Sequence, residues 1–179
     1  MLSVFDGLRD VTTLSVFVRL ACALICGGII GIERSYKRRP AGFRTHILIC
    51  IGAAITTLTS QYLYLNMHYF TDMARLGAQV VAGIGFIGAG TIITKRQRVK
   101  GLTTAAGLWT SAIIGLTFGG GFYEGGILAT VFIMLAELVF SRIEYRVLEN
   151  VPEINLYMEY EGKHCLDDVL QLYRSCNIK

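Results

Sequence analysis

The segment ARLGAQVVAGIGFIGAGTIIT, residues 74–94, has a single charged residue, near its start, and is dense in glycine. Gly83, Gly85 and Gly88 within it match the G-x-G-x-x-G pattern of dinucleotide-binding folds. That pattern indicates a nucleotide site only after a strand, at the start of a helix, with an acidic residue about 20 positions further on. No acidic residue follows the segment before Glu124. The run therefore favours a membrane-spanning helix over a nucleotide site.

The composition of the whole chain supports the membrane interpretation. Of the 179 residues, 53% are hydrophobic and only 17% are charged, and the mean hydropathy is +0.52. A soluble domain carries about 25% charged residues, whereas a helix that spans a bilayer needs around 20 mainly apolar residues. The apolar runs predict an all-α membrane protein whose residues 1–148 form a transmembrane domain of five helices. The predicted spans cover about 14–32, 45–65, 74–94, 102–119 and 121–140.

Lysine and arginine gather in the loops after the first, third and fifth predicted spans. These loops hold 11 of the 17 basic residues, and short loops rich in such residues stay on the cytoplasmic side. The pattern predicts that the N-terminus lies outside and the C-terminus lies in the cytoplasm. Topology thus accounts for the formal net charge of +4, and no nucleic-acid partner is expected.

The pattern of residues changes after Pro152. Residues 154–160 alternate between apolar and polar, as in a half-buried strand, and residues 165–176 carry apolar side chains at helical spacing. We expect residues 152–179 to form a short cytoplasmic βα segment. One strand and one helix cannot bury a core alone. The segment is therefore expected to begin a larger domain, to dock on another chain or to lie against the membrane.

Glycine in a membrane helix permits the close approach of a second helix, which matters because no hydrophobic force drives helices together in lipid. Small residues recur every four positions in the first span, at Ala23, Gly27 and Gly31. We predict that the glycines serve tight helix packing. For the third span, a broken helix whose free carbonyls bind an ion is the alternative. The predicted packing glycines are Gly27, Gly31, Gly83, Gly85, Gly88 and Gly90.

Two acidic residues lie in or beside the spans near the predicted cytoplasmic face. Ionisable side chains in a membrane are costly, which makes Glu33 and Glu137 candidates for a functional role. Glu33 is expected either to form a structural ion pair or to belong to a functional site, and Glu137 is expected to pair with a basic loop. A metal ion, if one binds, would use these two carboxylates. The residues expected near Glu33 are Arg34, Arg38, Arg44 and His46.

Several other polar residues stand at or inside span boundaries. Gln79, one turn into the third span, is expected to make a hydrogen bond between helices. Arg19 is expected to reach out to the outer surface. Thr103 can cap the helix that begins the fourth span, with Thr104 behind it and a basic loop before it. Simple capping and the binding of an anion such as a lipid phosphate are both consistent with this arrangement.

The sequence carries no recognisable catalytic set. It has no G-x-S-x-G, no H-E-x-x-H and no P-loop lysine, and its three histidines lie at unrelated positions. We therefore expect a protein that is not an enzyme and needs no cofactor.

Three blocks of the chain resemble the MgtC/SapB family of bacterial membrane proteins. They are GIERSYKRRPAGFRTHILICIGAA, RLGAQVVAGIGFIGAGTII and VKGLTTAAGLWTSAIIG, and the resemblance extends over about residues 28–123. It implies a multi-pass protein of the bacterial plasma (inner) membrane, often induced at low magnesium and, in pathogens, tied to virulence. Many relatives end in a cytoplasmic ACT-like domain, so residues 152–179 are expected to be part of such a domain.

The resemblance also selects candidate residues by position. At Thr103 some members of the family carry Asn, so the contact made there is expected to differ in this chain. Arg38 and Arg98 are added because they belong to the basic loops. The full set of functional candidates is Glu33, Arg34, Arg38, Arg44, His46, Gln79, Thr91, Arg98, Thr103, Thr104 and Trp109.

The best-studied members of the family have been described both as magnesium-transport-associated proteins and as inhibitors of the proton-translocating ATP synthase. We expect a non-catalytic protein, forming a homo-oligomer such as a dimer in the bilayer, that contacts another membrane complex such as the ATP synthase. The alternative is a transporter or channel subunit for magnesium or another cation. Mg²⁺ is held by carboxylates and keeps several waters, and a ring of Glu33 from several subunits would supply such ligands.

Overall fold

The computed structural model describes residues 3–70, 72–95, 98–148, 167–169, 171, 172 and 175. The chain divides into two compact units, residues 1–141 and residues 142–179. The predicted strand at residues 154–160 lies outside the described residues, as does most of the predicted helix at residues 165–176. The ACT-like segment therefore stays a prediction.

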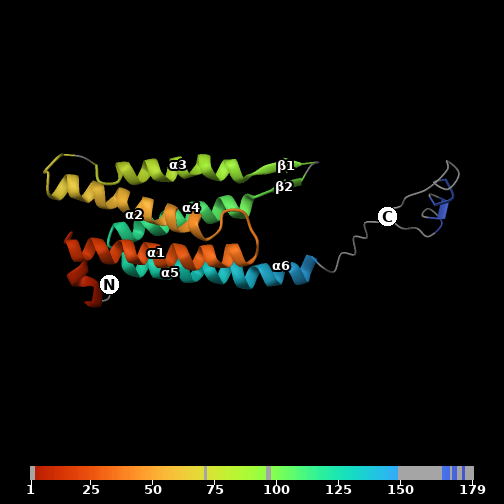
Figure 1. Ribbon diagram of the computed structural model, residues 1–179, viewed down its shortest axis with the longest axis horizontal. Helices are drawn as coiled ribbons and strands as arrows, with labels where there is room; N and C mark the ends of the chain where they lie inside the picture. The colour runs from red at the N-terminus through yellow and green to blue at the C-terminus, as the bar shows by residue number, and fades with distance from the viewer. Residues whose placement is uncertain are drawn as a thin grey trace. The chain divides into compact units, whose positions relative to one another are not determined.

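Helices make up nearly all of the first unit (Figure 1). A short 3₁₀ helix precedes the long helices, one small hairpin interrupts them, and a π-helical segment follows α5. The elements are η1 (Ser3–Leu8), α1 (Thr13–Tyr36), α2 (Phe43–Leu65), α3 (Arg75–Thr91), β1 (Ile93–Lys95), β2 (Arg98–Lys100), α4 (Leu102–Gly119), α5 (Tyr123–Leu135), η2 (Ala136–Phe140) and α6 (Ser141–Leu148).

Four helical segments are long and apolar enough to cross a membrane: Thr13–Tyr36, Phe43–Leu65, Leu102–Gly119 and Tyr123–Ile143. They correspond to the first, second, fourth and fifth predicted spans. The third predicted span forms α3, which has only 17 residues. At 1.5 Å per residue α3 is about 26 Å long, slightly less than the hydrocarbon thickness of about 30 Å. A fifth span therefore stays a prediction.

The predicted third span continued to residue 94, but α3 ends at Thr91. Ile93 and Thr94 instead belong to β1, which pairs antiparallel with β2 in the two-stranded sheet of the described chain. Gly101, between β2 and α4, has a φ of +96°. A side-chain carbon at this position would collide with the carbonyl oxygen of Thr91. Glycine therefore lets α3 end and α4 begin side by side.

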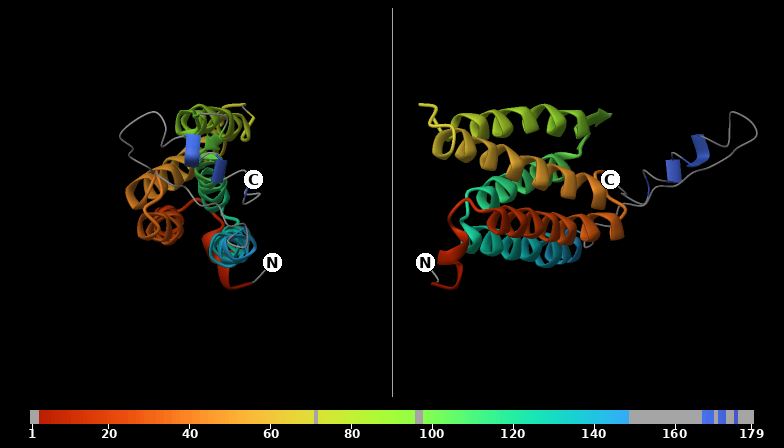
Figure 2. Two further views of the ribbon diagram at one scale, coloured as in Figure 1. Left: turned by 90° about the vertical axis from the view of Figure 1, so that its right-hand side faces the viewer. Right: turned by 60° about the vertical axis from the view of Figure 1, so that its left-hand side comes forward.

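α1, α2 and α4 form the centre of the bundle, with α3 at one edge and α5 at the other (Figure 1). The main core joins α1, α2 and α4 with the start of α5, through residues such as Ile30, Cys50, Phe118 and Tyr123. α3 packs mainly on α4 and less on α2, and Figure 2 shows α3 and α5 at opposite sides of the bundle. Of all the residues in α3, only Ile84 and Gly88 are buried.

Small residues allow α1 and α2 to touch at the backbone. A side-chain carbon added at Gly27 would lie 2.9 Å from the carbonyl oxygen of His46, and one added at Gly31 would lie 2.7 Å from Cα of Phe43. Gly115 in α4 is equally confined, because an added carbon would collide with the carbonyl oxygen of Cys50. These glycines fix the spacing of α1, α2 and α4.

The glycines of α3 differ from this pattern. A carbon added at Gly83, Gly85 or Gly90 would meet no atom of the described chain within 4 Å, whereas one at Gly88 would lie 3.3 Å from Cβ of Ala105. The prediction that all four pack against neighbouring helices is therefore wrong for three of them within a single chain. The physical reason is the position of α3 at the edge of the bundle, where one side faces α4 and the other is open.

Arg19 is buried rather than directed to the outer surface, contrary to the sequence-based expectation. Its guanidinium donates hydrogen bonds to the carbonyl oxygens of Leu8 and Gly119 and to Oε1 of Gln61. The carbonyl groups at the end of α4 have no partners within their own helix, so they accept from a cation readily. Arg19 thus holds η1, α1, α2 and α4 together at one end of the bundle.

A confined glycine and an exposed glycine should respond differently to substitution by alanine. Gly31→Ala should lower the melting temperature in detergent, because the added methyl group meets the backbone of Phe43 and overpacking costs about 1–3 kcal/mol. The matched variant Gly85→Ala adds a methyl group in open space and removes a glycine from a helix, which favours the helix by about 1 kcal/mol. It should leave the melting temperature unchanged or raise it. Equal destabilisation by both variants would contradict the arrangement of α3.

Candidate functional site

A cluster of polar side chains lies where α1 ends and η2 begins, inside an otherwise apolar bundle. Arg34 of α1 is at its centre and is only 2% exposed. Its Nη1 lies 3.1 Å from Oε2 of Glu137, and its Nη2 donates a 2.8 Å hydrogen bond to Oγ1 of Thr104. One side chain therefore ties α1 to the start of α4 and to η2. Guanidinium suits this role because its fixed fork of donors reaches two acceptors at once.

Lys37, the C-cap residue of α1, lies one turn after Glu33 and makes the second connection to η2. Its Nζ lies 2.6 Å from Oε1 of Glu33 and donates a 2.7 Å hydrogen bond to the main-chain carbonyl of Glu137. Ser141 also lies within reach, with its Oγ at 3.4 Å from Nζ. Glu33 and Glu137 are thus each matched by a cation, and the four charges of the cluster balance.

Both contacts of Glu137 are made from a segment with π-helical geometry, η2. A π segment is wider than an α-helix, and such segments occur frequently at functional sites. Glu137 lies in its first turn. There it presents its carboxylate to Arg34 and its carbonyl oxygen to Lys37. Both acceptors of Glu137 therefore meet side chains at the end of α1.

Apart from Oε1 of Glu33, which pairs with Lys37, three buried polar atoms of this region have no hydrogen-bond partner among the described residues: Oε2 of Glu33, Nε of Arg34 and Nε2 of His46. His46, in the first turn of α2, is fully buried, and its Nδ1 lies 3.0 Å from the carbonyl oxygen of Gly42. A carbonyl only accepts, so Nδ1 carries the hydrogen, and in the neutral ring Nε2 is left as an acceptor. Buried polar atoms are rarely left unpaired, which marks this region as the candidate functional site.

The sequence predicted Arg34, Arg38 or Arg44 as the partner of Glu33, and the structure replaces them with Lys37. Arg38 and Arg44 are exposed, and Arg34 turns toward α4 and η2. Residues four apart lie on the same face of a helix, whereas adjacent residues do not. The spacing of four residues between Glu33 and Lys37 is therefore the signal in the sequence from which this pair could have been predicted. No comparable pattern in the sequence indicates that Ser141 lies near Lys37.

Other candidate residues lie away from this cluster. Gln79 is exposed and makes no hydrogen bond with any part of the chain that the structure describes, so the predicted bond between helices is not formed within the chain. Thr91 donates a hydrogen bond to the carbonyl of Gly88. Trp109 is 44% exposed on α4. The side chain of Arg98 lies outside the described part of the structure.

Thr103 does not cap α4, contrary to one of the two sequence-based interpretations. The N-cap position is Gly101, and among the described residues no side chain caps the helix. Thr103 is exposed, whereas Thr104 is buried and accepts the hydrogen bond from Arg34. The left-handed conformation of Gly101 places the helix start where Thr103 is already inside the first turn.

The predicted metal ligands, Glu33 and Glu137, do not converge on a common point. Each faces a different cation of α1, and Lys37 lies between them. Among the described residues, no three His, Cys, Asp or Glu side chains come together as a metal site.

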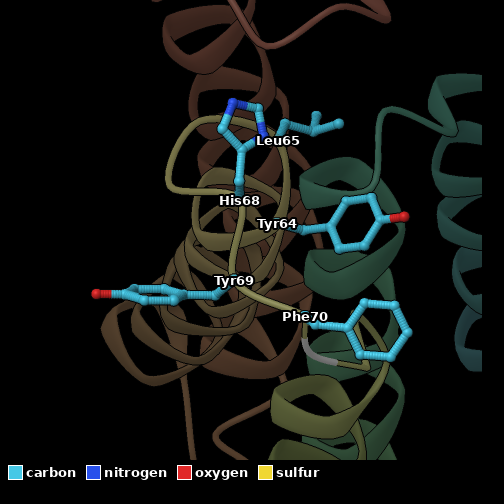
Figure 3. Close-up of a pocket in the computed structure, with 5 residues that line it drawn as sticks. All are labelled: Tyr64, Leu65, His68, Tyr69 and Phe70. Carbon is cyan, nitrogen blue, oxygen red and sulfur yellow. The ribbon is translucent and has the colours of Figure 1, made fainter.

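A shallow hollow of about 330 Å³ lies at the opposite end of the bundle, after α2, and is lined by Tyr64, Leu65, His68, Tyr69 and Phe70. In Figure 3 the rings of Tyr69 and Phe70 point in different directions and do not enclose a common space. Aromatic residues are enriched where membrane proteins meet the lipid headgroups. We therefore interpret this loop as an interfacial aromatic belt.

Comparison with known proteins gives one consistent result. The sequence model of the MgtC family matches residues 20–146. "Putative magnesium transporter YhiD" of Escherichia coli is 41% identical over 148 residues, which is 80% of this chain and 69% of that protein. "Protein MgtC" of Salmonella typhimurium is 38% identical over 130 residues, which is 73% of this chain but only 54% of that protein. No solved structure matches the chain.

The two acidic residues of the cluster are expected to differ in their effect on stability. Glu137→Gln leaves the buried Arg34 without a counter-charge, and breaking a buried ion pair from one side costs about 3 kcal/mol. Glu33→Gln should cost less, because Lys37 is partly exposed and keeps its bond to the carbonyl of Glu137. Thermal unfolding in detergent would compare the two variants with the wild type. A larger loss for Glu33→Gln would show that Arg34 is not the main connection.

Proposed function

The chain belongs to the MgtC family, and we propose that it is a non-catalytic protein of the bacterial inner membrane that supports growth under magnesium limitation by contacting another membrane complex. Its N-terminus lies outside and its C-terminus in the cytoplasm, since that orientation places the basic loops inside. The observation that carries the proposal is the open face of α3, where Gly83 and Gly90, two turns apart on the same side of the helix, have no neighbour in the described chain.

A helix face made of small residues is suited to contact with a second helix. In lipid, association depends on close van der Waals contact and hydrogen bonds, and glycine provides the close approach. Gln79 lies on the same helix, exposed and without a partner among the described residues. A side-chain amide that faces lipid is costly, and a second helix would supply its hydrogen bond. Phe86, 86% exposed, adds a large apolar side chain to this face.

The polar cluster serves the same function by holding the rest of the bundle fixed. Arg34 and Lys37 fasten η2 to α1, and their charges are balanced by Glu33 and Glu137. Binding costs less free energy when the binding surface is already rigid. The family resemblance suggests the membrane part of the proton-translocating ATP synthase as the partner. A second copy of this chain is the other candidate partner.

Cation transport is the alternative, and two observations favour it. A relative carries the name of a magnesium transporter. Glu33 also has one carboxylate oxygen without a partner among the described residues. Transport through this site would require a cation to displace Lys37 from Glu33, because the two atoms lie 2.6 Å apart. The contact proposal requires no such exchange.

Two glycine variants test the contact proposal. Gly83→Leu fills the open face of α3 and should reduce complementation of low-magnesium growth at unchanged protein abundance, in a strain that lacks the chromosomal gene. Gly52→Leu is the matched control, since Gly52 of α2 also has no neighbour within 4 Å but lies on another helix. It should complement normally. Full complementation by Gly83→Leu would remove the face of α3 from the function.

A flux measurement separates contact from transport. The purified protein in liposomes should carry no more Mg²⁺ than empty liposomes do, if its role is contact. Magnesium flux by the wild type that is lost in Glu33→Gln would instead establish transport through the cluster. A photoreactive residue in place of Phe86 identifies the partner, and cross-links to a second copy alone would assign the face of α3 to a homo-oligomer.

A further inference from the structure

The imidazole ring of His46 faces a small internal space on α4. His46 is fully buried, and Gly107 of α4, which is also buried, lies opposite its Nε2. A side-chain carbon added at Gly107 would lie 3.7 Å from Nε2 and would meet no other described atom within 4 Å outside the adjacent turns of α4. An atom the size of a methyl carbon therefore fits between the ring and the helix, on a side that His46 makes polar.

The polar cluster reaches the same face of α4. Thr104 accepts the hydrogen bond from Nη2 of Arg34, and Thr104 lies one turn before Gly107, so the two residues share a face of the helix. The charges of Arg34 and Glu33 also act on the His46 ring. Arg34 of α1 and His46 of α2 therefore approach α4 one turn apart, beside the same space.

The buried atoms of this region that lack partners define what could bind there. Among the described residues, Nε of Arg34 is an unpaired donor, and Oε2 of Glu33 and Nε2 of His46 are unpaired acceptors. The three residues are 2%, 7% and 0% exposed. A buried polar atom without a partner is costly. The complementary ligand accepts one hydrogen bond and donates two.

We propose that this space is a binding site for an internal water molecule, which accepts from Nε of Arg34 and donates to Oε2 of Glu33 and Nε2 of His46. Internal waters typically make about three hydrogen bonds. A metal cation cannot accept from Arg34, and a fully ionised anion cannot donate to the two acceptors. The charges of the cluster already balance, which also favours a neutral ligand. The proposal does not depend on contact through α3.

Magnetic resonance of the full chain in lipid nanodiscs, with ¹⁵N in arginine and histidine, tests the site in the wild type. The Nε–H of Arg34 should show a cross-peak to a long-lived water, and Nε2 of His46 should have the ¹⁵N shift of a hydrogen-bonded acceptor in a neutral ring. Adding Mg²⁺ or inorganic phosphate should change neither signal. Loss of the water cross-peak on adding either ion, or its absence from the start, would overturn the proposal.

Two substitutions of Gly107 distinguish a water site from a dry gap. Gly107→Ala places only a methyl group in the space, whereas Gly107→Ser adds a hydroxyl group that can donate to Nε2 of His46. Alanine is the better helix former, so a dry gap would make the alanine variant the more stable one. A water site reverses the order, and Gly107→Ser should melt at least about 2 °C above Gly107→Ala. The opposite order would overturn the proposal.

Gly77 of α3 provides the matched control. A side-chain carbon added there would lie 3.5 Å from Cδ2 of Leu116, in an apolar setting. Gly77→Ala should therefore melt above Gly77→Ser. If serine were favoured at Gly77 as well, the order at Gly107 would reflect a general preference of the bundle, and the proposal would fail. If neither Gly107 variant folds, the water cross-peak of the wild type decides.

Discussion

The guanidinium of Arg34 connects three segments that are far apart in the sequence, and the half of the bundle around the end of α1 depends on it. Burying a charge in an apolar bundle is costly unless it is paired and hydrogen-bonded. Glu137 and Thr104 meet this requirement together, 103 and 70 positions further along the chain. The contact of Lys37 with the carbonyl oxygen of Glu137 adds to this connection, because it also holds η2 against the end of α1.

The helices could be predicted from the sequence because the membrane imposes a length on apolar runs, and four of the five predicted spans are long and apolar enough in the structure. The partners in the polar cluster could not. Proximity in sequence suggested that Glu33 and Arg34 pair with each other, but neighbouring residues on a helix point in different directions. Arg34 meets a residue of another helix, and a single sequence contains no information on which distant residue that is.

The glycines show a different limit of sequence analysis. Gly27 and Gly31 lie on a stripe with larger residues elsewhere around α1, so the sequence indicates which side can be approached. α3 carries glycine or alanine on nearly every side, so its sequence does not distinguish the face toward α4 from the open face. Only the position of α3 at the edge of the bundle separates Gly88 from Gly83 and Gly85. Because Gly83 and Gly85 make no contact with the other helices of the described chain, they are available for contact with a second protein.

The two buried arginines of α1, Arg19 and Arg34, hold α1 and α4 together, and none of their hydrogen bonds within the described chain goes to α3. Arg19 binds the carbonyl of Gly119 at the end of α4, and Arg34 binds Thr104 at its beginning. Arg19 interacts favourably with the helix dipole, because it meets the negative C-terminal end of α4. Arg34 lies near the positive N-terminal end of α4, where the carboxylate of Glu137 offsets the repulsion. α1 and α4 are thereby joined at both ends, and α2 is held between them by backbone contacts at Gly27, Gly31 and Gly115. α3 takes part in none of these connections, so contact of a partner with its open face leaves them intact.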